Sequence, residues 1–165
     1  MFTATPLADL ASRISGRVVT AADPAWDEVR QVFNLTTDLH PAAIVLPCDA
    51  VDVAITVDFA RAHGLQVAPQ ATGHNAAALG SIPDTLLIDV RELREIQIDV
   101  EKRRVRVGAG VRWQDVVPRL SELGLAALHG SSPSSASPAT PSEEGWAGWR
   151  ASTASRPTAS PPSRW

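Results

Sequence analysis

The sequence lacks the features that would place it among disulfide-rich or nucleic-acid-binding proteins. Its single cysteine, Cys48, excludes an internal disulfide and a zinc site made of several cysteines. We expect this residue to be a small apolar filler near a strand end. The formal net charge is -3, so the basic excess typical of nucleic-acid binders is missing. No nucleic-acid partner is expected.

Two kinds of targeting segment are missing as well. No apolar run approaches the ~20 residues that a membrane-spanning helix needs. The start of the chain carries Asp9 and has no basic stretch ahead of an apolar segment, so it does not resemble a secretory signal. These features predict a soluble cytoplasmic protein with no membrane partner.

The four histidines do not indicate a metal site. No pair of them has a spacing such as i, i+4, which would place two imidazoles on one face of a helix. His40 is expected in a surface loop, and His63 in the last turn of a helix. No metal is predicted.

A change in composition divides the chain. Hydrophobic residues make up 44% of it, which is enough for a packed core. Residues 131–165, however, contain no Val, Ile, Leu, Met or Phe and are mostly Ser, Pro, Ala and Thr. Such a segment cannot bury enough apolar surface to offset the entropy of ordering it. We expect an N-terminal extension over 1–22, a domain over 23–134 and a disordered tail over 135–165.

The tail has a second explanation at the level of the gene. Read one nucleotide earlier, GC-rich codons for residues 135–145 can encode Val-Gly-Val-Ala-Gly-Tyr-Ser-Leu-Gly-Gly-Gly. That string has the strand and glycine-loop character that the tail lacks. We hypothesise that the tail is translated out of frame and that the domain is truncated. A coding sequence whose codons cannot yield that string would eliminate the hypothesis.

The domain itself is predicted to be α+β. Asp49 is placed to cap a helix over 50–63, which Gly64 ends. Apolar residues at 41–47 and 65–68 indicate two parallel strands that this helix joins in a right-handed unit. The remaining expected elements are helices over 24–33 and 113–123, and strands over 85–89, 96–100, 104–107 and 125–128, the middle two strands forming a hairpin.

The most informative segment is the loop at 70–80. It follows a predicted strand and contains two glycines and four alanines. Such small residues let backbone N–H groups approach a ligand, and successive amides form a cradle for an anion such as a pyrophosphate. His74, in the middle, is a nucleophile. The loop predicts a nucleotide cofactor bonded at one point; the alternative is a turn of small residues with a surface histidine.

Two further small-residue turns follow, at 107–110 and 129–132. The series Pro-Ala-Ala-Ile-Val-Leu-Pro, Gln-Ala-Thr-Gly-His-Asn, Leu-Leu-Ile-Asp-Val, Val-Gly-Ala-Gly-Val and His-Gly-Ser-Ser-Pro-Ser resembles the PCMH-type FAD-binding domain of the vanillyl-alcohol oxidase family. The berberine-bridge-enzyme-like branch is the most similar. The resemblance covers about residues 25–134 and implies the N-terminal part of that fold. The out-of-frame string is what this family would place next.

The resemblance implies a role for each matching residue. His74 corresponds to the histidine that bonds to the 8-methyl carbon of the flavin, and a neutral imidazole is a suitable nucleophile near pH 7. The other matching residues are expected around the cofactor: Gln70, Ala71, Thr72, Gly73, Asn75 and Gly80 in the first loop, Gly108, Ala109 and Gly110 in the second turn, and Gly130, Ser131 and Ser132 in the third. Doubly tethered relatives have a cysteine where Ser132 stands, so a single tether through His74 is expected.

Other polar and aromatic residues are given structural roles. Trp26 and Trp113 are expected to pack in helices. Asp89 and the charged residues after it are interpreted as a solvated turn. His129 is interpreted as a loop residue, with cofactor contact as the alternative.

The resemblance implies an FAD-dependent oxidoreductase that oxidises a small organic substrate, with molecular oxygen as the electron acceptor. The substrate domain and the catalytic base would lie beyond the break, so no catalytic residue is assigned and the chain alone is expected to be inactive. Two alternatives stay open. One is a non-catalytic module that binds a nucleotide or phosphate, and the other is an inactive truncated product.

Overall fold

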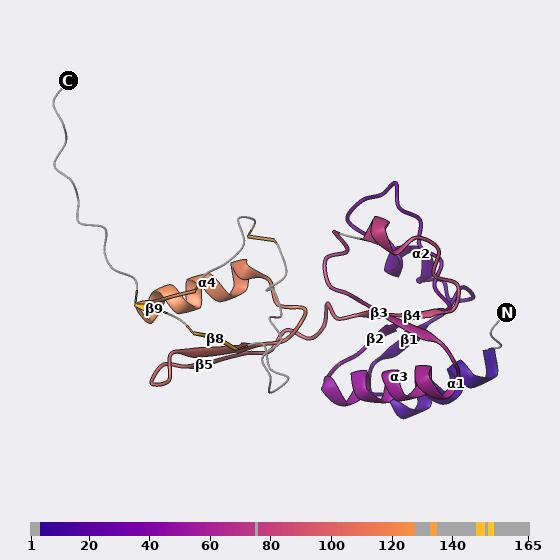
Figure 1. The fold of residues 1–165 in the computed structure, drawn as a ribbon, viewed down its shortest axis with the longest axis horizontal. Helices are drawn as coiled ribbons and strands as arrows, with labels where there is room; N and C mark the ends of the chain where they lie inside the picture. Colours follow the sequence, from indigo (N-terminus) through magenta and orange to yellow (C-terminus); the bar gives the residue numbers. More distant parts are fainter. Residues whose placement is uncertain (1–3, 75, 128–132, 135–147, 151, 154–165) are drawn as a thin grey trace, which may run out of the picture.

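The computed structural model describes residues 4–74, 76–127, 133–134, 148–150 and 152–153. Figure 1 shows two lobes that mix helices and strands, as the predicted α+β class requires. One lobe contains a four-stranded sheet of order β1-β2-β4-β3. The other contains a three-stranded sheet of order β5-β6-β8, with helix α4 packed on it.

The first sheet is built on its two most apolar strands. β2 (Ala43–Leu46) and β4 (Thr85–Asp89) are buried at every position and pair in parallel. Continuous burial is typical of strands that are covered on both faces. β3 (Gln66–Gln70) runs parallel to β4, and β1 (Arg17–Val19) runs antiparallel to β2. The strands predicted at 41–47 and 65–68 are therefore parallel to each other, but β4 lies between them.

Helices cover both faces of this sheet (Figure 1). α1 (Ala4–Arg13) and α3 (Ala50–Ala62) lie on one face. α2 (Trp26–Val29) and the short 3-10 helix η1 (Ala76–Leu79) lie on the other, where Trp26 and Ala76 share one apolar cluster. The sheet is thus the middle of three layers.

Helix α3 starts and ends where its sequence predicts. The Asp49 carboxylate accepts hydrogen bonds from the backbone N–H groups of Val51 at 2.8 Å and Asp52 at 2.9 Å. This contact satisfies two donors that the first helical turn leaves unpaired. Gly64 follows the helix with φ +66°, a left-handed conformation that glycine adopts without a steric penalty.

The helix predicted over 24–33 is much shorter than expected. Only α2 is helical, because one turn is enough to bury Trp26 and Val29 on the sheet. Beyond it, the Arg30 side chain bonds to the carboxylates of Asp27 and Asp38, and the chain turns away as a loop. The packing role expected for Trp26 is confirmed.

The prediction for Cys48 is wrong, because this residue is exposed. The chain leaves the sheet after Leu46, and the backbone N–H of Cys48 donates to the Asp52 carboxylate at 2.9 Å. That hydrogen bond fixes the backbone of the connection between β2 and α3, while the thiol side chain lies outside the core.

The segment over 1–22, expected as an extension, contributes to the first lobe. Leu7, Leu10 and Ile14 follow helical spacing and are buried in the apolar cluster that contains Phe59. β1 adds the edge strand next to β2. The structure therefore differs here from the predicted boundary between extension and domain.

The second lobe is a hairpin covered by one helix. β5 (Ile96–Asp99) and β6 (Arg104–Val107) pair as the predicted hairpin. α4 (Trp113–Glu122) buries Trp113 and Val116 against it, which confirms the packing role expected for this tryptophan. β7 (Leu125–Ala126) follows the helix, close to the predicted strand.

Two short pieces of the predicted disordered tail are extended. β8 (Gly148–Arg150) pairs with β6, and β9 (Ser152–Thr153) pairs with β7. At these places the structure differs from the prediction, because backbone N–H and C=O groups can extend a sheet edge without apolar side chains. The other residues of 135–165 lie outside the described residues, so disorder there and the frame hypothesis stay predictions. Among the helices that the structure describes, none has the length and apolar content to cross a membrane.

Candidate functional site

A pocket of about 330 Å³ lies where β3 ends. The carboxyl ends of β3 and β4 meet at this edge, because the two strands are parallel and adjacent. Ligands of open α/β sheets commonly bind at such an edge. The pocket is lined by Pro69, Gln70, Ala71, Thr72, Gly73, His74, Ala76 and Leu79. Five predicted cofactor residues, 70–74, are therefore brought together.

The backbone of the loop has the conformation that its glycines permit. Gly73 has φ +70° and Gly80 has φ +64°, both in the left-handed region. A Cβ atom on Gly73 would lie 3.1 Å from the Cβ of Val32, so the loop also packs closely there. Ala76 donates its backbone N–H to the carbonyl of Gly73 at 3.2 Å, which closes a turn around His74. The loop thus has a defined shape with small side chains around its backbone.

Gln70 supplies a polar atom that lacks a partner. Its side chain is 6% exposed, and its Oε1 accepts no hydrogen bond from the part of the chain that the structure describes. A buried acceptor without a donor costs free energy, so a ligand with an O–H or N–H group would satisfy it. This is the first indication from the structure that the pocket is built for an occupant.

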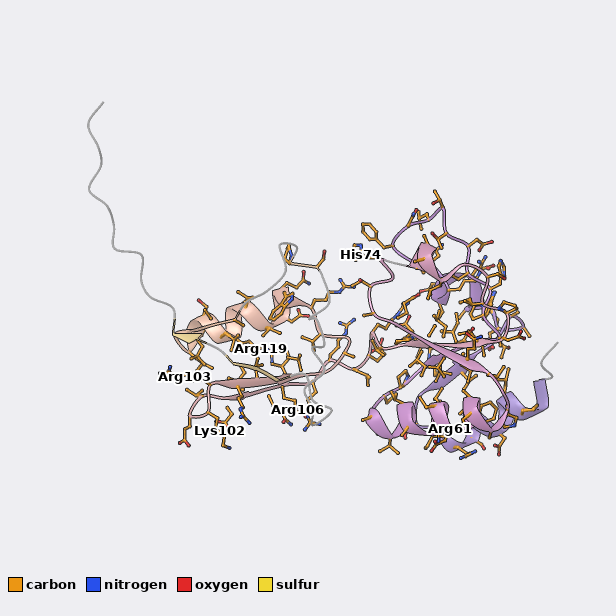
Figure 2. The ribbon with its side chains drawn as sticks, viewed as in Figure 1. Arg61, His74, Lys102, Arg103, Arg106 and Arg119 are labelled. Atoms are coloured by element: carbon orange, nitrogen blue, oxygen red, sulfur yellow. The ribbon has the colours of Figure 1, made fainter. Side chains whose placement is uncertain are left out.

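His74 is an exposed residue in the middle of the loop at 70–80. Figure 2 shows it on the side of the sheet opposite to Arg61, which belongs to α3. Its ring is accessible and stands 4.1 Å from the ring of Phe33, centroid to centroid, with an angle of 41° between the planes. The imidazole is therefore part of the pocket wall, and a bound ligand can reach it.

Asp89, next to Gln70, forms an ion pair with Arg91 in which the carboxylate is buried and the guanidinium is partly exposed. Asp89 stands opposite Gln70 in the β3–β4 register and is completely buried, so the predicted solvated turn is wrong for this residue. Its carboxylate accepts from the backbone N–H of Arg91 at 3.0 Å and from its Nε at 2.8 Å. The same guanidinium donates to the carbonyl of Val29 at 3.4 Å. The hydrogen bond with Asp89 raises the pKa of Arg91, despite partial burial.

The sequence contains a signal for this ion pair. Asp89 directly follows the apolar run Leu86–Ile88, and an arginine follows two positions later. An acid at the end of a buried strand needs a cation or several N–H donors, because a buried charge is costly when unpaired. The pair fixes the end of β4 beside the pocket.

The turn at 108–110 needs glycines because it packs closely against the backbone of a neighbouring segment. A Cβ atom on Gly108 would lie 2.2 Å from the carbonyl oxygen of Leu93, and one on Gly110 would lie 2.1 Å from that of Val90. The turn packs against the connection between β4 and β5, and the backbone N–H of Gly110 donates to Leu93 at 3.0 Å. Gly108, Ala109 and Gly110 are not among the residues that line the pocket, so their predicted cofactor contact stays a prediction.

Several predicted site residues lie outside the described residues: Asn75, His129, Gly130, Ser131 and Ser132. Their predicted roles stay predictions. Gly80 lies just beyond the pocket lining. Within the described residues, no group of three His, Cys, Asp or Glu side chains could hold a metal ion. His40 is exposed beside Asp38, and His63 bonds through Nδ1 to the carbonyl of Phe59 at 2.8 Å.

Comparison with known sequences and structures gives consistent similarities. The profile of the family described as FAD binding domain matches residues 41–142. The (R)-6-hydroxynicotine oxidase of Paenarthrobacter nicotinovorans is 31% identical over 130 residues, which make up 79% of this chain and 27% of that protein. Berberine bridge enzyme-like 27 of Arabidopsis thaliana is 34% identical over 114 residues, or 63% of this chain and 21% of that protein.

A solved structure shares both the sequence pattern and the fold. The crystal structure of 6-hydroxy-D-nicotine oxidase from Arthrobacter nicotinovorans superposes with a TM-score of 0.70 at 30% identity, over 82% of this chain and 29% of that one. The chain spans about a quarter of the length of the curated relatives it matches.

Proposed function

Because the chain belongs to the family of FAD binding domains, we propose that it holds FAD for an oxidoreductase reaction. The family profile matches residues 41–142, which is more than half of the chain, and it confirms the resemblance found in the sequence. The chain spans only about a quarter of its relatives, so the reaction of a whole protein is part of this proposal.

The residues of the pocket fit an FAD molecule. The left-handed Gly73 and the small side chains beside it leave backbone N–H groups free to approach a pyrophosphate, as in other anion-binding loops. FAD also carries hydroxyl groups that could donate to Oε1 of Gln70, which has no donor among the described residues. This buried acceptor within a glycine-containing loop is the observation that carries the proposal.

FAD would supply the electron-transfer chemistry, and the chain would supply binding and orientation. Relatives named as oxidases favour a small organic substrate as the electron donor and molecular oxygen as the acceptor. No residue of this chain is assigned as the catalytic base. The buried pair of Asp89 and Arg91 is a structural support of the site, because the carboxylate is completely enclosed and already bonded.

We further propose that His74 forms the single covalent tether. An imidazole nitrogen of His74 would bond to the 8-methyl carbon of the flavin, while one C–H bond of that methyl group and the N–H bond of the imidazole break. The two electrons and two protons released would reduce molecular oxygen to hydrogen peroxide, so the flavin ends oxidised. The exposure of His74 and its place in the pocket wall support this role.

The test is incubation of the 165-residue chain with FAD in air, followed by acid precipitation. We expect yellow, acid-stable protein whose mass has increased by one flavin, and no acid-stable flavin with His74→Ala. His40→Ala, at an exposed histidine that does not line the pocket, is the matched control and should behave like the parent. Reversible binding in both the parent and His74→Ala would favour the alternative of a non-catalytic phosphate-binding module. Absence of soluble folded protein would favour the alternative of an inactive product.

A further inference from the structure

Two segments that are far apart in the sequence lie against each other at His74. We propose that Phe33 is a positioning residue that holds the His74 imidazole in the orientation needed for the flavin tether. The inference rests on the proposed function, because it concerns the efficiency of that bond. It concerns a residue outside the loop at 70–80 and outside every motif that carried the resemblance.

The contact is made by consecutive residues of both segments. Val32 is buried and packs closely on Gly73. A Cβ atom added to Gly73 would lie 3.1 Å from the Cβ of Val32. The next pair, Phe33 and His74, has its rings 4.1 Å apart. The ring planes meet at 41°, and the packing of Val32 on Gly73 comes directly before this contact in both segments. The backbone contact therefore sets the position of the phenyl ring relative to the imidazole.

The loop that carries Phe33 is closed at its base and stiffened within. Arg30 and Asp38, on either side of the loop, form an ion pair, and Arg30 Nε also donates to Asp27 at 2.8 Å. Inside the loop, the Asn34 side chain accepts from the backbone N–H of Thr36 at 3.1 Å. A loop with these restraints can hold an exposed side chain in a defined place.

The exposure of Phe33 is hard to explain by packing alone. Its side chain is 70% exposed, so it contributes little to the core. Leu35, in the same loop, is exposed too, but it does not line the pocket. Phe33 differs from it in one respect, because its ring contacts the ring of His74. The position of Phe33 therefore serves the imidazole and not the core.

Bond formation requires the nucleophile and the carbon to meet at about 3–3.5 Å with aligned orbitals. An exposed histidine samples several side-chain rotamers, and only some of them direct a given nitrogen at the ligand. A phenyl ring against one face of the imidazole reduces that freedom before FAD arrives. Phe33→Leu should therefore slow the tethering step about tenfold, with unchanged reversible affinity for FAD.

The experiment compares the parent with Phe33→Leu, Phe33→Tyr and, as matched control, Leu35→Ala. NMR spectra of the FAD-free chain report the ring-current shift of the His74 imidazole protons, assigned with His74→Ala. Time courses with excess FAD then separate the reversible dissociation constant from the first-order rate of acid-stable flavin formation. We expect Phe33→Leu to abolish the ring-current shift and slow the first-order step, while Phe33→Tyr and Leu35→Ala resemble the parent.

Each contrary result has a distinct meaning. If the imidazole shift is unchanged in Phe33→Leu, the contact is absent and the inference fails, even though tethering by the parent would still support the proposed function. If Phe33→Leu loses the shift but tethers at the parental rate, Phe33 is not a positioning residue. If the parent forms no acid-stable flavin, the tether itself is wrong and the positioning role fails with it.

Discussion

Gln70 and Asp89 stand opposite each other at the carboxyl ends of two parallel strands, and both side chains are buried. Their polar groups differ in one respect. The Asp89 carboxylate is bonded to Arg91, whereas Oε1 of Gln70 has no donor within the described residues. An unsatisfied buried acceptor needs an explanation, and a hydrogen bond from the ligand is the one that follows from the proposed function.

Gln70→Leu should therefore make the folded chain more stable and weaken its binding of FAD. Replacing a buried amide whose oxygen has no donor within the described residues with an apolar side chain should raise the free energy of unfolding by about 1 kcal/mol. The same change should weaken reversible FAD binding about tenfold, because a ligand hydrogen bond is lost. Urea unfolding and titration of flavin fluorescence measure the two effects.

Gln66→Leu is the control for that substitution, since Gln66 begins the same strand but is exposed. It should leave FAD binding unchanged. A less stable Gln70→Leu chain with parental FAD affinity would show that the Gln70 amide serves the fold and not the ligand.

Arg91→Ala should destabilise the first lobe strongly. It would leave the carboxylate of Asp89 completely buried without its cation, and removing one partner of a buried pair costs about 3–5 kcal/mol. The side chain of Arg91 is itself 37% exposed, so water can replace part of the lost contact, and about 2–3 kcal/mol is expected. Thermal unfolding measures the loss.

Arg61→Ala is the matched control, because Arg61 pairs with Asp58 on the surface and is 78% exposed. It should cost less than about 0.5 kcal/mol. The double variant Asp89→Asn with Arg91→Ala should recover part of the stability lost in Arg91→Ala, since no buried charge remains. Equal stabilities of the single and double variants would contradict the role assigned to the ion pair.

The sequence predicts the features of this site that depend on neighbouring residues in the chain, and misses those that depend on contacts between distant segments. The loop at 70–80 was predictable, because glycine and alanine at the end of a strand have a local meaning that packing does not change. The contact between Phe33 and His74 could not be predicted, since it depends on how the fold places the loop after α2 against the loop at 70–80. The same holds for Asp89, whose burial is decided by neighbouring strands and α2.

The fold shows the same division. The strands β2 and β4 were predicted from continuous apolar runs, and α3 from its cap and its terminal glycine. The helix at 24–33 was predicted too long, because one turn is enough to bury Trp26 and Val29 and the chain then continues as a loop. The family match extends to residue 142, past the predicted domain boundary at 134, and the reading frame of that stretch stays a prediction for the coding DNA to test.

Asp52 should make the stability of the chain sensitive to acid. Burial alone would raise the pKa of this carboxyl, but hydrogen bonds from the backbone N–H groups of Cys48, Ser15 and Gly16 outweigh it and lower the pKa below 3.8. The unfolded chain therefore binds a proton at a higher pH than the folded chain. The stabilisation is complete above about pH 4 and is lost as the pH falls through the lower, folded pKa.

Asp52→Asn removes this dependence and one or two of the hydrogen bonds. We expect a loss of about 3 kcal/mol at pH 7, shrinking as the pH falls below 4. Asp58→Asn, on the exposed side of the same helix, should be close to neutral at every pH. Urea unfolding from pH 3 to pH 7 would show the difference, and parallel pH profiles for the parent and Asp52→Asn would contradict it.

Gly73→Ala and Gly64→Ala test whether the left-handed turn in the pocket serves binding. The two glycines have nearly the same φ, +70° and +66°, so an added Cβ atom should cost about 1–2 kcal/mol of strain at each. At Gly64 nothing lies within 4 Å of that atom, whereas at Gly73 it would contact Val32 at 3.1 Å and stand in the pocket lining. Both variants should lose stability, Gly73→Ala more than Gly64→Ala because of its contact with Val32. Only Gly73→Ala should weaken FAD binding, by tenfold or more, since the loop amides would be displaced. Fluorescence titration at a temperature where both variants are folded measures this; equal FAD affinity in the two variants would mean that the loop at 70–80 does not hold the cofactor.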